Sequence, residues 1–158
     1  MHLTSVPWFT DWAWSLPLIV PTVLIHVFGL GLFNEHIIPV LGAVVERGHR
    51  TAMFGVVMSA TVLVATILHG LEGTLWALTY RFLGALPDLR SAMLYSLGSM
   101  TTYGHAEVYL ENRWQLMGAL EALNGIILFG LTTAFLFGTI VRVWPVSGMV
   151  WHRDSTRS

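Results

Sequence analysis

The sequence predicts an all-α integral membrane protein with three transmembrane helices and one short helix that re-enters the bilayer between the second and the third. Of its 158 residues, 54% are hydrophobic and only 11% are charged, whereas about a quarter of the residues of a soluble domain are charged. Three stretches reach the roughly 20 apolar residues that a helix needs to cross the hydrocarbon core. A polar, glycine-containing segment lies between the last two of them.

The first span is expected over residues 16–46. Pro17 and Pro21 are expected in its first turns, where the missing N–H costs least, and Pro39 is expected to kink its far end. Residues 1–15 lack the basic start of a cleaved signal and contain several tryptophans. They are therefore predicted to form an interfacial segment that stays on the protein.

The second span is expected from Thr51 to Leu71 without any charge and then on to about Tyr80, and the third from about Trp114 to Val143. Arginines predict the orientation. Five flank the side that contains the loop between spans one and two and the end of span three (Arg47, Arg50, Arg142, Arg153 and Arg157), against three opposite. The positive-inside rule then places the N-terminus outside and residues 144–158 in the cytoplasm as a tail.

Residues 87–100, PDLRSAMLYSLGSM, are predicted to form the short helix. Pro87 suits the first helical position and Asp88 the first turn, where an acid favours the helix dipole. A helix of this length cannot span, and the polar turn 101–107 follows it at once. The bilayer tolerates such a re-entrant loop only where protein or a water-filled pore surrounds it.

Two spans that flank a re-entrant helix and a Thr-Thr-x-Gly turn resemble the pore unit of the potassium-channel superfamily, in which the turn reads Thr-Val-Gly-Tyr-Gly-Asp. The segments HGLEGTLWALTYRFLGALPDL and RWQLMGALEALNGIILFGLTTAFLF are similar to small bacterial two-pore-type ion-channel proteins. The resemblance covers about residues 68–140, roughly half of the chain. It does not cover the first span, which is an addition to the minimal two-span pore.

The resemblance implies a homotetrameric cation channel in a bacterial inner membrane, with residues 51–143 as its pore domain. It implies passive conduction of potassium and sodium, no enzymatic activity, no cofactor and no metal other than the permeant ions. Self-association and the bilayer are the expected interactions, and no basic run suggests nucleic acid. The implied ion filter consists of Thr101, Thr102, Tyr103, Gly104, His105 and Ala106, with Glu107 at the pore mouth.

The implied filter departs from the family in its outer half. Thr102 and Gly104 keep the family's residue types, but Ala106 replaces the outer glycine, which would cost on the order of 1 kcal/mol per subunit in a left-handed conformation. His105 replaces a bracing tyrosine and can become cationic near neutral pH, so current is expected to fall with acid. Weakened potassium selectivity is therefore predicted.

Two alternatives stay open for the filter. A strictly potassium-selective channel results if Glu107, or Tyr95 together with Trp76, supplies the missing support. The second alternative is a relative of these channels that does not conduct ions. A structural membrane scaffold would likewise assemble without any ion flux.

Two acids lie inside the predicted spans, where acids tend to be paired or functional. Glu72 is expected either to support the short helix from behind or to lie in interfacial water. Glu121 is expected to pair with a backbone or hydroxyl group behind the filter or to face the pore. In span three, Gly125 is either a hinge or a close-packing position. Thr132 and Thr133 either line the inner cavity or bond back to their own helix.

The histidines raise a different hypothesis. His26, His36, His49 and His69 lie in or beside spans one and two, and paired membrane histidines can ligate haem. A haem-binding electron-transfer subunit is therefore the alternative of another class, although it leaves the re-entrant turn unexplained.

Overall fold

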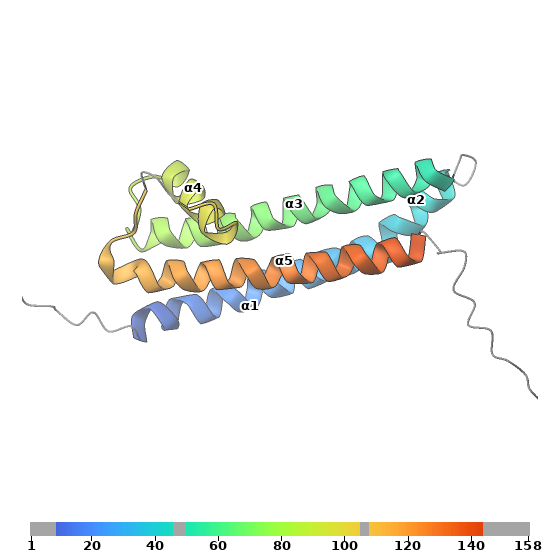
Figure 1. Ribbon diagram of the computed structural model, residues 1–158. Helices are drawn as coiled ribbons and strands as arrows, with labels where there is room; N and C mark the ends of the chain where they lie inside the picture. Colours follow the sequence, from blue (N-terminus) through green and yellow to red (C-terminus); the bar gives the residue numbers. More distant parts are fainter. Residues whose placement is uncertain (1–8, 46–49, 105–107, 144–158) are drawn as a thin grey trace, which may run out of the picture.

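Three long helices lie side by side in the computed structural model, which describes residues 9–45, 50–104 and 108–143 (Figure 1). They are α1 (Phe9–Leu32), α3 (Arg50–Phe82) and α5 (Gln115–Val143). α1 and α5 run in the same direction and α3 runs opposite to them (Figure 1). No strand occurs within the described ranges. The predicted all-helical class is thus confirmed.

All three long helices qualify as membrane spans by length and composition, over Phe9–Leu41, Thr51–Phe82 and Asn112–Val143. The polarity of α1 is inverted relative to that of a helix in a soluble bundle. On α1 the buried side chains include four polar ones (Asp11, Ser15, Thr22 and His26), while Val20, Leu24 and Phe28 are exposed. Polar groups that face other helices and apolar groups that face outward suit a lipid environment. The chain is therefore a membrane protein.

The first helix begins earlier than predicted. α1 starts at Phe9, so residues 9–15 belong to it and do not form a separate interfacial segment. Pro17 and Pro21 consequently lie inside the helix and not in its first turns, a placement that membrane helices tolerate because neighbouring groups satisfy the freed carbonyls. The first eight residues lie outside the described part of the chain.

A π-helical segment, η1 (Phe33–Ile37), follows α1 and leads into α2 (Ile38–Val45). Pro39 is the second residue of α2, and its ring nitrogen has no proton to give to the carbonyl four residues before it. A helix that contains a proline often has a widened, π-helical turn directly before it, which accommodates the missing hydrogen bond. The irregularity expected near Pro39 therefore precedes it in the chain.

The short helix α4 (Leu89–Met100) lies against α3 and α5 at the end of the bundle where α1 begins (Figure 1). Asp88 is its N-cap, not a first-turn residue as predicted, and its side chain accepts a hydrogen bond of 2.9 Å from the Ser91 backbone N–H. After α4 the chain passes the turn 101–104 and the one-turn 3-10 helix η2 (Asn112–Trp114) before α5. A buried cluster around Trp76, Tyr80 and Met117 fills the space between these elements.

Candidate functional site

Glycines on the two neighbouring helices allow α4 to approach closely. A Cβ atom at Gly125 would lie 2.6 Å from the Cα of Met100, the last residue of α4, and a Cβ at Gly118 would meet the Tyr95 hydroxyl. On α3, a Cβ at Gly73 would lie 3.2 Å from the Leu97 side chain. The structure thus gives Gly125 a packing role, and α5 continues through it as one helix from Gln115 to Val143.

Hydroxyl groups fasten α4 to both neighbours. Ser96 Oγ donates to the Gly73 carbonyl of α3 at 2.8 Å, and Ser99 Oγ donates to the Gly118 carbonyl of α5 at 2.9 Å. Both serines are buried. Because helix backbones already use their own hydrogen bonds, such side-chain bonds add cross-links that suit a low-dielectric environment.

Glu121 connects the same elements from behind. Its Oε2 accepts from the Tyr80 hydroxyl of α3 at 2.8 Å, and its Oε1 is hydrogen-bonded to Ser96 Oγ of α4. The side chain is fully buried. Glu121 therefore pairs with hydroxyl groups, which is one of the two placements that the sequence left open.

Two aromatic side chains named for filter support also pack here. Trp76 is fully buried, with its ring centroid 6.2 Å from that of Tyr80. Tyr95 meets Tyr80 edge to face, with centroids 5.4 Å apart. The sequence did not point to Tyr80 or Ser96, because nothing in their spacing shows which side chain they meet on another helix.

The turn after α4 is exposed on the monomer. Thr101, Thr102, Tyr103 and Gly104 are all exposed, Tyr103 to 90%. Thr101 Oγ1 donates to the Leu97 carbonyl, and the Gly104 N–H reaches the Gly98 carbonyl at 3.3 Å. These bonds fold the turn back onto the end of α4. His105, Ala106 and Glu107, to which the expectations on selectivity and acid block refer, lie outside the described residues.

Left-handed backbone occurs twice in this turn. Gly104 has φ +78°, which glycine adopts freely, but Thr102 has φ +57°. A β-branched residue with positive φ is an outlier that costs on the order of 1–2 kcal/mol. Such strain persists where the surroundings hold the backbone in a conformation that a function requires.

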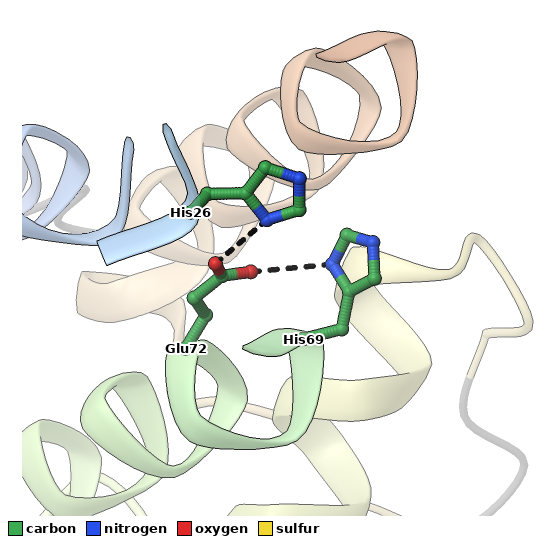
Figure 2. Close-up of side chains that lie close together, drawn as sticks. All are labelled: His26, His69 and Glu72. Carbon is green, nitrogen blue, oxygen red and sulfur yellow. Dashed lines mark hydrogen bonds and ion pairs between the residues drawn. The ribbon is translucent and has the colours of Figure 1, made fainter. Parts of the chain in front are cut away.

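A second cluster lies deeper in the bundle, where α1 and α3 meet (Figure 2). His26 Nδ1 is hydrogen-bonded to Glu72 Oε1 at 2.9 Å, and His69 Nδ1 lies 3.2 Å from Glu72 Oε2. The His26 and Glu72 side chains are fully buried, and the His69 side chain is 14% exposed. Two placements were considered for Glu72: interfacial water and a bond to α4. The structure shows neither, because the Glu72 side chain is fully buried and its carboxylate is hydrogen-bonded to His26 of α1.

Thr132 of α5 closes this cluster from the other side. Its Oγ1 lies 2.9 Å from His26 Nε2 and 3.2 Å from His69 Nε2. The same hydroxyl also donates to the Leu128 carbonyl of its own helix at 3.1 Å. Thr133 donates to the Phe129 carbonyl at 2.8 Å and to no other group in the described part of the chain. Both threonines therefore bond back to α5, and Thr132 in addition holds both histidines.

These contacts bring together two of the histidines that the haem hypothesis names, His26 and His69. The two imidazole rings lie with their centroids 5.0 Å apart and share one carboxylate and one hydroxyl. His36, a further histidine of that hypothesis, is exposed and lies 3.2 Å from the Leu32 carbonyl; His49 lies outside the described residues.

Known protein families, curated proteins and solved structures were compared with this chain, and none matches it. Functional conclusions therefore depend on the geometry of the two clusters.

Proposed function

We propose that this protein is the subunit of a homotetrameric cation channel, in which α4 re-enters the membrane and the turn 101–107 forms the ion filter. The observation that carries the proposal is the depth of the end of α4. Met100 contacts Gly125, which lies about 15 Å along α5 from its start, and α5 with its 29 residues is about 43 Å long. When α5 is centred on a hydrocarbon core about 30 Å thick, this contact lies about 8 Å inside the core. The polar turn that follows α4 would then lie well inside the bilayer.

An exposed turn at that depth requires a cover. In lipid, each unpaired backbone polar group costs several kcal/mol, so irregular backbone occurs only where protein or water surrounds it. One copy leaves Thr101–Gly104 exposed. Further copies of the chain around a water-filled axis would supply both protein and water, and the resemblance to potassium-channel pores makes the number four.

The charge of the permeant ion follows from the direction of α4. Its C-terminal end, with partial negative charge on the last carbonyls, is the end that leads into the turn. Carbonyl groups of the turn add to the same potential. A pathway lined in this way favours cations, with potassium and sodium as the proposed ions and conduction that is passive.

The orientation and location belong to the same proposal. α4 and the start of α1 lie at one end of the bundle (Figure 1), and the arginine distribution assigns that end to the outside. With the resemblance, this gives a bacterial inner-membrane channel whose C-terminus is cytoplasmic. Weakened potassium selectivity, or strict selectivity as the alternative, depends on residues 105–107.

The test is ion flux in proteoliposomes made from the full chain. Wild type is expected to carry potassium and sodium, Thr102→Ala to reduce potassium flux at least tenfold, and Thr102→Ser to retain most of it. Thr66→Ala is the matched control, because Thr66 is exposed on α3 and, among the residues that the structure describes, bonds only to the Val62 carbonyl. A folded tetramer with flux at background would refute the channel and favour the scaffold; the reversal potential in mixed potassium and sodium gives the selectivity.

A further inference from the structure

Four polar side chains from all three spans form a closed ring inside the bundle. The ring consists of His26, Glu72, His69 and Thr132, with Glu72 between the two Nδ1 atoms and Thr132 between the two Nε2 atoms. Ion conduction does not use this ring, since the turn after α4 forms the proposed filter. Burial of so many polar groups in a membrane calls for a role of its own.

Hydrogen counting shows what the ring lacks. The Thr132 hydroxyl has one proton, which it gives to the Leu128 carbonyl, and two lone pairs, which two Nε2–H groups can fill. Both Nδ1 atoms are then lone-pair acceptors that face a carboxylate, which is also an acceptor. In this arrangement the facing acceptors need a positive charge between the Nδ1 atoms and Glu72, which either a proton or a metal cation would supply.

The opposite tautomers leave a different defect. If both Nδ1 atoms carry the protons, they donate to Glu72, but two Nε2 lone pairs then compete for the single Thr132 proton. One extra proton, on one ring, would repair this defect. However, His69 Nδ1 and Glu72 Oε2 are buried and 3.2 Å apart without forming a directed hydrogen bond with each other or with any other described group. The two atoms face each other as an ion pair without a directed hydrogen bond, and a cation between them would bond to both.

We propose that His26 Nδ1, His69 Nδ1 and the Glu72 carboxylate bind one divalent first-row transition cation of the zinc class. One donor atom from each residue lies within 4.8 Å of the others. Bonds of about 2.0–2.1 Å in a tetrahedral site place neighbouring donors about 3.3 Å apart. The nitrogen–oxygen distances here are 2.9 Å from His26 Nδ1 to Glu72 Oε1 and 3.2 Å from His69 Nδ1 to Glu72 Oε2, so both oxygens of the carboxylate face the site. Two imidazoles with one carboxylate suit zinc or iron and not calcium or magnesium, which prefer oxygen.

Thr132 supplies the support that such ligands need. A metal-bound histidine donates its other N–H to a neighbouring acceptor, which fixes its tautomer and its orientation. One hydroxyl does this for both rings. The Phe129 ring stacks on His69 with centroids 4.5 Å apart and holds the one ligand that is partly exposed. The ion would join α1 to α3, with α5 held through Thr132.

The test measures zinc on the purified full chain in nanodiscs, exposed to Zn²⁺ and desalted, by elemental analysis. One equivalent per chain is expected to be lost in His69→Ala and in Glu72→Gln, and to remain in His36→Ala, whose histidine is exposed outside the ring. Thr132→Val is expected to weaken zinc binding 10–100-fold, whereas Thr132→Ser keeps the hydroxyl and most of the affinity.

Wild type alone provides a second measurement in case a variant fails to fold. Zn²⁺ is expected to raise the melting temperature of the wild type, and a chelator to reverse the rise, because binding to the folded state alone stabilises it. The proposal is overturned if wild type retains less than a tenth of an equivalent of zinc. It is overturned equally if folded His69→Ala and Glu72→Gln retain as much zinc as His36→Ala. Neither result bears on ion flux, so this proposal and the channel fail separately.

Discussion

Gly125→Ala is expected to displace α4 from α5. The added Cβ would lie 2.6 Å from Met100 Cα and 2.9 Å from its carbonyl carbon, about 1 Å closer than carbon atoms normally approach. Both neighbours are backbone atoms, so no change of side-chain rotamer can relieve the clash. The end of α4 must move by a comparable distance, and the turn 101–104 must move with it.

Overpacking of this kind costs roughly 1–3 kcal/mol of unfolding free energy. In a chain of this length each kcal/mol corresponds to roughly 2–4 °C in melting temperature. The measurement is the melting temperature in detergent together with potassium flux in liposomes. Both are expected to fall, flux more strongly, because the displaced atoms are those that lead into the turn.

Gly138→Ala is the matched control, since it places the same substitution in the same helix where nothing lies within 4 Å of the new Cβ. Alanine is a better helix former than glycine by about 0.5–1 kcal/mol, so this variant is expected to equal or exceed wild type. If Gly125→Ala proves as stable as Gly138→Ala and conducts normally, the close contact between α4 and α5 is not what positions the turn.

Three further predictions concern side chains that form hydrogen bonds between or at the ends of helices. Glu121→Leu leaves the buried Tyr80 hydroxyl without its acceptor and removes the hydrogen bond to Ser96, and it is expected to lower the unfolding free energy by about 1–4 kcal/mol. Glu121→Gln should cost less. Asn124→Leu removes the 2.8 Å bond from its amide to Thr22 of α1 and is expected to cost about 0.5–2 kcal/mol. The Ser91 backbone N–H holds the pKa of Asp88 below its usual 3.8, so the cap's contribution is present above about pH 4 and is lost as pH falls further.

Melting temperatures measured across pH check the prediction for Asp88. Asp88→Asn retains a helix cap without the titrating group, so its melting temperature should fall less between about pH 4 and lower pH than that of the wild type. An unchanged profile would count against the cap.

For the buried residues Glu121 and Asn124, Glu111→Gln is the comparison, since this exposed acid pairs only with Arg113 at 2.8 Å among the described residues. Losses no larger than in that variant would show that the buried bonds contribute little.

Much of the fold was predictable because length and composition act locally. Each span is an apolar run long enough to cross a bilayer, and the short helix ends where polar residues begin. The errors fall at boundaries, as with α1, which continues back to Phe9 through residues that the tryptophans suggested were interfacial. Composition marks where a segment meets polar surroundings but not where its hydrogen bonds begin.

The partners of the polar side chains were not predictable in the same way. The spacing of His69 and Glu72 shows that they share a face of one helix, which is a local property. His26 completes their cluster because of the way α1 is rotated and shifted against α3. Thr132 joins it because of the position of α5 against both helices. Gly125 likewise could be a hinge or a contact until α4 was placed against it.

The sequence by itself determined that this is a helical membrane protein with three spans and a short helix followed by a polar turn, because hydrophobic length needs no partner to be recognised. Only the tertiary structure decided that Glu121 fastens that helix and that Glu72 belongs to the histidines. The physical reason is that a buried polar group must be paired, yet its pair comes from another helix, whose rotation and depth are set by packing along the whole interface.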